Sequence, residues 1–86
     1  MNKTLIKTFN VELNTELFYV IADVEVVATA ECDLNGRITD YPEIDNATIK
    51  GYEAYDDNGD DIEVSLTAEQ VIDLYEIASD KFMEAH

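Results

Sequence analysis

Residues Thr67–Ala85, TAEQVIDLYEIASDKFMEA, decide the fold because they predict one amphipathic helix. At about 100° of turn per residue, the apolar side chains of this stretch fall within an arc of about 100°. Helices that pack against a sheet have an apolar stripe of this width. The arc consists of Val71, Leu74, Tyr75, Ala78, Phe82 and Ala85.

The start of this helix is marked by a capping box. Thr67 can accept a hydrogen bond from the backbone N–H of Gln70, and the Gln70 side chain can reach back to the backbone of Thr67. Leu66 precedes the cap and can pack against Val71 as a hydrophobic staple. The helix is therefore predicted to begin directly after Thr67.

The chain before the helix has the pattern of four strands. Apolar and polar residues alternate in these stretches, as is typical of half-buried strands, and two of the turns contain Asn-Gly. The predicted strands are Thr4–Leu13, Leu17–Cys32, Ala47–Tyr55 and Ile62–Leu66, with turns at Asn14–Glu16, Asp33–Arg37 and Asp57–Asp60. The whole chain is predicted to be one α+β domain. It has an antiparallel four-stranded sheet, in an order that fits a meander, with one C-terminal amphipathic helix packed on one face.

The second predicted strand is unusually long, so we expect it to curve strongly or to divide into two segments. Its even positions are apolar throughout, and its odd positions begin with Leu17, Tyr19 and Ile21. The start of the strand is therefore expected to be covered on both faces, and a second copy of the chain is one way to cover it. In the last hairpin, a two-residue turn pairs Tyr55 with Ile62, whereas a three-residue turn with a bulge pairs Ala54 with Ile62 and Tyr52 with Val64. The second turn is preferred because it leaves Glu53 outside.

The chain is very acidic: 20 Asp and Glu against 5 Lys and Arg give a net charge of −15 in 86 residues. Its 47% hydrophobic content is that of a folded domain. Such a charge opposes direct binding to nucleic acid or to an anionic membrane, and it favours a basic protein surface or cations as partners. The sequence has no signal-peptide pattern and no apolar run of membrane-spanning length, so the cytoplasm is the expected location.

Five carboxylates form a row on the polar side of the predicted helix. Neighbours in the row lie about 5–6 Å apart at Cβ, which is comparable to the phosphate spacing of a nucleic acid strand, and the nearest base is Lys81. The row is either a solvated face or a set of groups that binds a basic partner. It consists of Glu69, Asp73, Glu76, Asp80 and Glu84.

A second group of acids, Asp56, Asp57, Asp60 and Asp61, surrounds the last Asn-Gly turn. Aligning Gly59 with the glycine of an EF-hand loop places Ala54 and Ser65 at the first and last ligand positions, where neither can act as a ligand. We interpret the turn as an acidic hairpin tip that extends the charge of the helix. Weak calcium binding is the alternative, and it predicts a thermal shift with calcium and none with magnesium.

The sequence has few candidates for catalysis. His86 is the only histidine and ends the chain, and Cys32 is the only cysteine and is expected to be a small core residue. No glycine-rich phosphate loop, serine nucleophile motif or Cys/His metal set is present, so no enzyme activity, cofactor or metal site is predicted.

The segment Ile49–Thr67, IKGYEAYDDNGDDIEVSLT, followed by the helix, is similar to the ending of small acidic accessory proteins of tailed bacteriophages. The similarity covers roughly the last 40 residues. It is a pattern of strand, Asp-rich turn, strand and capped helix. Some phage proteins of this size and charge are DNA mimics that inhibit restriction, CRISPR or nucleoid proteins. The resemblance implies an inhibitor acting in the host cytoplasm, and it transfers no individual residue because such mimics share charge rather than fold.

Two functions from different classes follow. The first is a non-enzymatic inhibitor whose helix row and Asp-rich turn occupy a basic nucleic-acid-binding surface. The second is an assembly module that forms a homodimer through the start of the long strand, with the acidic surface serving solubility.

Overall fold

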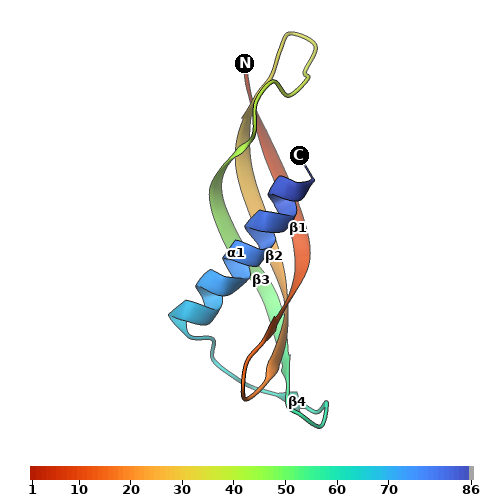
Figure 1. Ribbon diagram of the computed structural model, residues 1–86, viewed down its shortest axis with the longest axis vertical. Coiled ribbons are helices and arrows are strands. Elements are labelled where there is room, and N and C mark those ends of the chain that lie inside the picture. Colours follow the sequence, from red (N-terminus) through yellow and green to blue (C-terminus); the bar gives the residue numbers. More distant parts are fainter. Residues whose placement is uncertain (86) are drawn as a thin grey trace.

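The computed structural model describes residues 1–85 and contains four strands followed by one helix. The strands form one antiparallel sheet in the order β1-β2-β3-β4, so the predicted meander is confirmed (Figure 1). The elements are β1 (Asn2–Asn14), β2 (Tyr19–Glu31), β3 (Glu43–Tyr55), β4 (Asp61–Ile62) and α1 (Ala68–Glu84).

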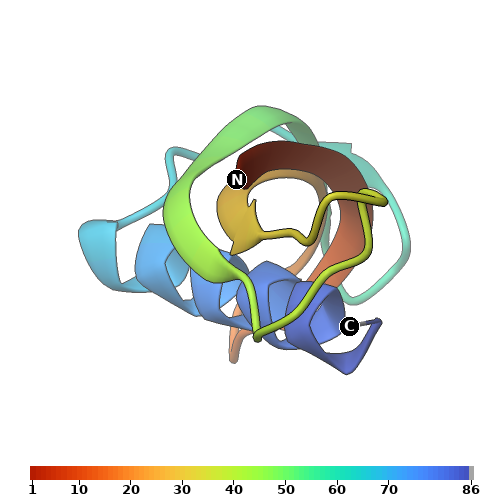
Figure 2. The ribbon, with the colours of Figure 1, turned by 90° about the horizontal axis from the view of Figure 1, so that it is seen from above.

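The sheet is long, narrow and curled. The Cα atoms span 53 × 20 × 17 Å. Figure 2 shows β1, β2 and β3 as an arc with α1 lying across its open side. The helix contacts all three long strands, so it covers one face of the sheet as predicted. We call this the inner face, and the opposite face, over which no described helix or strand lies, the outer face.

The core lies between the inner face and α1, and the central strand β2 supplies most of it. Its even-numbered residues from Val20 to Ala30 are at most 1% exposed. The alanines among them let the helix approach closely, and larger residues of α1 fill the remaining space. Phe82 is 1% exposed and packs edge-on against Phe9, with ring centroids 6.4 Å apart. Cys32 is also buried, as predicted.

The helix begins where the capping box predicts. The Thr67 hydroxyl accepts a hydrogen bond from the Gln70 backbone N–H at 3.2 Å, and the Gln70 side-chain oxygen accepts one from the Thr67 N–H at 2.9 Å. These bonds satisfy two of the N–H groups that a helix leaves without intrahelical partners. The helix ends at Glu84, one residue earlier than predicted, because Ala85 is its C-cap.

The prediction for the start of β3 was wrong: the strand begins at Glu43 and not at Ala47. Two register shifts against β2 leave Asp45 and Lys50 as extra residues in β3. Each extra residue interrupts the two-residue alternation of side chains, so the strand pattern is weak in the sequence. β2 itself is one continuous, curved strand from Tyr19 to Glu31, and of the two predicted forms the single strand is correct.

The predicted length of β4 was also wrong, although its register was right. Ala54 pairs with Ile62, as the three-residue turn requires, but the strand stops there, so the predicted pairing of Tyr52 with Val64 does not form. The chain then leaves the edge of β3 to reach the inner face, where α1 begins. The Tyr52 hydroxyl donates a hydrogen bond to the Val64 carbonyl at 2.8 Å, and this contact holds the departing segment against β3.

The two Asn-Gly turns have the same hydrogen-bond pattern. In one, the Asp33 carboxylate accepts the N–H groups of Asn35 and Arg37, and the Gly36 N–H donates to the Asp33 carbonyl. The turn at Asp56 repeats all three bonds with its own residues. Each turn therefore depends on an aspartate that ties the loop to its own side chain.

The turn that joins β3 and β4 can be tested by substitution of Gly59. Its φ is +82°, a left-handed conformation that costs a residue with a Cβ about 1–2 kcal/mol. We expect Gly59→Ala to lower the free energy of unfolding by about 1 kcal/mol in a urea titration. The matched control is Gly51→Ala, whose Cβ meets nothing within 4 Å and whose φ is not positive. An equal loss of stability in the two variants would contradict the conclusion that the turn requires a left-handed residue at position 59.

Candidate acidic interface

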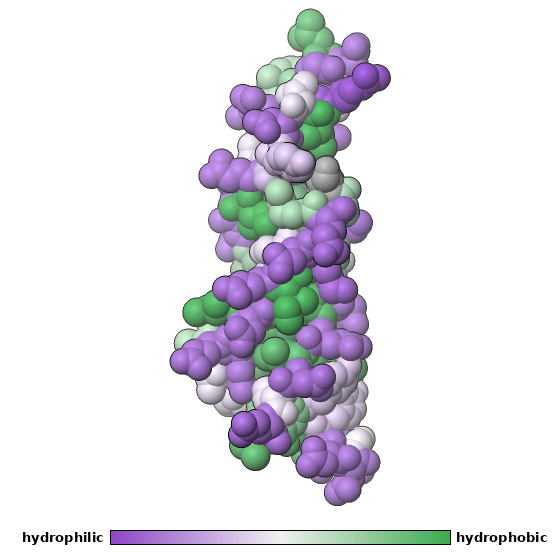
Figure 3. Space-filling view, in the orientation of Figure 1, coloured by the Kyte–Doolittle hydropathy of each residue, from purple (hydrophilic) through white to green (hydrophobic). Residues whose placement is uncertain are grey.

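The five carboxylates of the helix row are all exposed on the side of α1 that faces away from the sheet. The described residues form no ion pair with them, because the one ion pair within residues 1–85 joins Lys50 to Glu25 at 3.8 Å. Figure 3 shows a diagonal band of hydrophilic side chains along the course of α1. The structure therefore leaves all five residues of the predicted row exposed on one side of the helix: Glu69, Asp73, Glu76, Asp80 and Glu84.

An exposed aliphatic side chain that the sequence analysis missed lies beside this row. Ile72 is 53% exposed, and it lies one helical turn before Glu76 on the same side of α1. Apolar side chains at the border of a charged surface supply contact area that charge alone does not. The signal was present in the sequence, because Ile72 falls outside the apolar arc of the helix.

The acids of the hairpin turn lie apart from the helix row. Figure 1 shows the turn between β3 and β4 at one end of the molecule, whereas α1 crosses its middle. Asp57, Asp60 and Asp61 are exposed, but the Asp56 carboxylate accepts two backbone N–H groups and holds the turn. Asp56 thus has a structural role besides any contribution to surface charge.

The residues predicted to be covered on both faces lie on and beside the outer face. Leu17 is in the turn between β1 and β2 and is 79% exposed. Tyr19 and Ile21 are partly buried on the outer face, where they neighbour Tyr55 and Glu53 of β3. No described helix or strand covers them.

Two tyrosines on the outer face have a raised pKa. The Tyr55 hydroxyl donates a 2.5 Å hydrogen bond to Glu53, and this bond, with the nearby charges of Glu53 and Asp61, raises the pKa of Tyr55 to about 12. Glu12 raises the pKa of Tyr19 in the same way, by accepting its hydrogen bond. Both phenols are therefore neutral at physiological pH, and they face carboxylates at this end of the sheet.

We expect a spectrophotometric titration to show one tyrosine ionising near pH 12, and Glu53→Gln to return it toward 10.0. Because folding raises this pKa, the stability it contributes is fully present below pH 10.0 and is lost as the pH rises through about 12. Glu12→Gln is the control, because it removes the partner of Tyr19 and leaves the Tyr55 component in place. If the ionisation near pH 12 were unchanged in Glu53→Gln, the hydrogen bond to Glu53 would not be the cause of the raised pKa of Tyr55.

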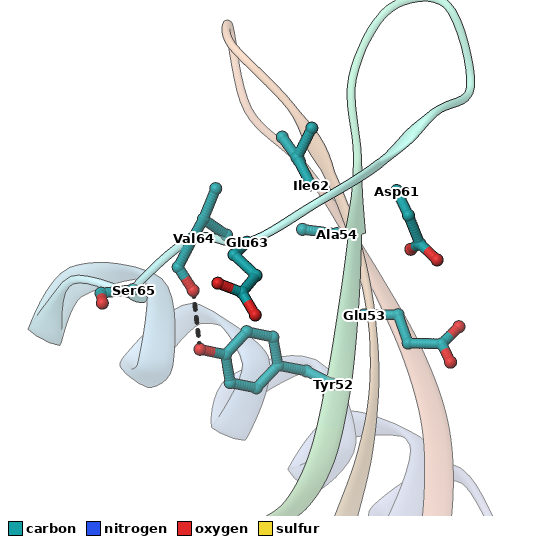
Figure 4. Close-up of a pocket in the computed structure, with 8 residues that line it drawn as sticks. All are labelled: Tyr52, Glu53, Ala54, Asp61, Ile62, Glu63, Val64 and Ser65. Carbon is teal, nitrogen blue, oxygen red and sulfur yellow. Dashed lines mark hydrogen bonds between the residues drawn. The ribbon is translucent and has the colours of Figure 1, made fainter.

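A groove of about 720 Å³ lies between the end of β3 and the segment that follows the hairpin turn. Three carboxylates line it, but Figure 4 shows Glu53 and Asp61 on one side of β3 and Glu63 on the other, near Tyr52. The groove is thus an open surface feature whose acids point in different directions. Within residues 1–85 no three His, Cys, Asp or Glu side chains are placed to share a metal ion. His86 lies outside the described residues.

No family model matches the chain, and neither a curated protein nor a solved structure resembles it at a significant level. In the described part of the chain, α1 is too short and too polar to cross a membrane.

The mean density of negative charge along the molecule is close to that of nucleic acid. A net charge of −15 over a length of 53 Å is about one negative charge per 3.5 Å. One strand of duplex DNA carries a charge about every 3.4 Å along the helix axis. The protein therefore has about the linear charge density of a single nucleic acid strand, on a body 20 Å wide.

Proposed function

We propose that this protein is a non-enzymatic inhibitor that occupies a basic nucleic-acid-binding surface of another protein. The carboxylates of α1 take the place of phosphates, and the acids of the hairpin turn add to the negative potential. The resemblance to phage accessory proteins suggests host defence proteins, such as restriction or CRISPR components, as the first targets to examine.

The observation that carries the proposal is the exposed row on α1, for which residues 1–85 supply no ion-pair partner. Like charges three and four residues apart destabilise a helix by a few tenths of a kcal/mol per pair. A surface needed only for solubility usually mixes both signs, whereas here Lys81 is the single base of the helix. The row therefore has an energetic cost that solubility alone does not explain.

The mechanism is electrostatic recognition followed by short-range contact. The strongly negative field steers a basic partner toward the protein and raises the association rate, an effect that falls steeply with ionic strength. Carboxylates of α1 then pair with lysine and arginine side chains of the target. Ile72, at the border of the row, adds apolar contact that favours one partner over others.

The test is capture from a bacterial lysate by the immobilised protein, after nuclease treatment to expose nucleic-acid-binding surfaces. We expect recovery of a nucleic-acid-binding protein that elutes with salt and is displaced by added duplex DNA. Capture of nothing, or of proteins that DNA does not displace, would overturn the proposal. A polyglutamate resin serves as the control, because a specific target binds this protein and not acidic polymer in general.

A further inference from the structure

We propose that two copies of this chain associate through β1. The two β1 strands pair antiparallel, and the dimer has one continuous sheet with six long strands. This inference does not rest on the proposed function. It follows from the position, regularity and charge of β1.

β1 is the free edge of the sheet. Its 13 residues pair with β2 on one side, and no described strand pairs with the other. Its pairing with β2 runs without a register shift from Asn2 to Asn14, and the strand contains no proline. Such an edge exposes a row of backbone N–H and C=O groups that can pair with another strand.

The other edge of the sheet lacks these properties. β3 carries the extra residues Asp45 and Lys50, and β4 covers part of its free side. Bulges and short covering strands are the devices by which proteins prevent pairing at an edge. The contrast indicates that β1 is the edge left open for pairing.

Charge favours β1 as the edge along which two copies of this chain meet. β1 contains Lys3 and Lys7 against one acid, Glu12, so it carries a net positive charge. β2, β3 and α1 each contain more acids than bases. Two copies of this acidic chain therefore repel each other least when they approach along β1.

The apolar residues of β1 give the register. Leu5, Phe9 and Leu13 lie on the inner face but remain partly exposed, whereas Val24 and Val26 of the neighbouring strand are fully buried. A two-fold axis at Phe9 places the two Phe9 side chains opposite each other and each Leu5 opposite Leu13 of the second copy. This register continues the apolar row across the interface, and it forms about ten backbone hydrogen bonds, the usual number for a specific interface.

The first test is sedimentation equilibrium at low and high salt. We expect a dimer of twice the 9.7 kDa chain mass that strengthens with salt, because salt screens the repulsion between two acidic chains. Ile6→Asp with Thr8→Asp, both at exposed outer-face positions of β1, should weaken the dimer about tenfold or more by adding negative charge at the edge. A monomer at every salt and protein concentration would overturn the proposal.

The matched control is Asn46→Asp with Thr48→Asp, which adds the same charge at exposed outer-face positions of β3. A dimer weakened equally by both pairs of changes would overturn the assignment to β1. In a Cys32→Ala background, a mixture of Thr8→Cys and Asn10→Cys chains should form a disulfide that neither chain forms alone. If the dimer is present and this disulfide does not form, the interface as proposed is wrong.

The outcomes separate this inference from the proposed function. Target capture weakens with salt and depends on α1, whereas the dimer strengthens with salt and depends on β1. A dimer without target capture would overturn the inhibitor proposal alone, and target capture by a protein that stays monomeric would overturn the dimer alone.

Discussion

Replacing Phe82 with alanine is expected to lower the free energy of unfolding by about 3–5 kcal/mol, the usual cost of removing a buried aromatic ring. Phe82 is 1% exposed, and its ring packs edge-on against Phe9 at the junction of α1 and β1. A domain of this size has a total stability of roughly 4–13 kcal/mol, and a net charge of −15 reduces it through self-repulsion. The change should therefore remove a large part of the stability, and the variant should unfold at a clearly lower urea concentration than the parent protein.

Urea unfolding followed by circular dichroism measures this effect. Phe82→Leu is the control, because it keeps most of the buried volume and should cost clearly less, roughly 1–2 kcal/mol. Added salt should raise the unfolding midpoint of every variant by screening the acidic surface. A loss below about 1 kcal/mol for Phe82→Ala would mean that the α1 contact is not a main source of stability.

Those parts of the fold that local chemistry determines could be predicted from the sequence. The capping box located the start of α1, and the Asn-Gly turn set the Ala54–Ile62 register. The start of β3 could not be predicted, because the bulge at Asp45 depends on pairing with β2 and interrupts the alternation that marks a strand.

The candidate site was partly predictable for the same reason. Helical periodicity alone places the five acids of α1 on one exposed face. The separation of the hairpin turn from α1, and the use of the Asp56 carboxylate inside its turn, depend on tertiary structure. The predicted meander already places β1 at an edge of the sheet, but the regular pairing of β1 and the partial cover of β3 by β4 depend on tertiary structure.

Reversing three charges on α1, with Asp73→Lys, Glu76→Lys and Asp80→Lys together, is expected to weaken target binding about a thousandfold. Each reversal turns an attraction into a repulsion, and about 1.4 kcal/mol per site gives a factor of ten. The helix should survive, because the new lysines at both ends of this group can pair with Glu69 and Glu84 one turn away. Isothermal titration of the captured target measures the affinity, and circular dichroism checks the helix.

The control for this prediction changes the same amount of charge elsewhere. Glu16, Glu31 and Glu43 are exposed and lie outside α1, so their replacement by lysine alters the net charge equally and leaves the helix row intact. Because general attraction is screened within about 8–10 Å at physiological salt, this variant should lose about tenfold or less. Equal losses for the two triple variants would mean that only total charge matters, and the row on α1 would then have no special role. A large loss of affinity confined to the α1 variant would identify the carboxylates of α1 as the contact surface, because the same change of charge elsewhere would then have little effect on binding.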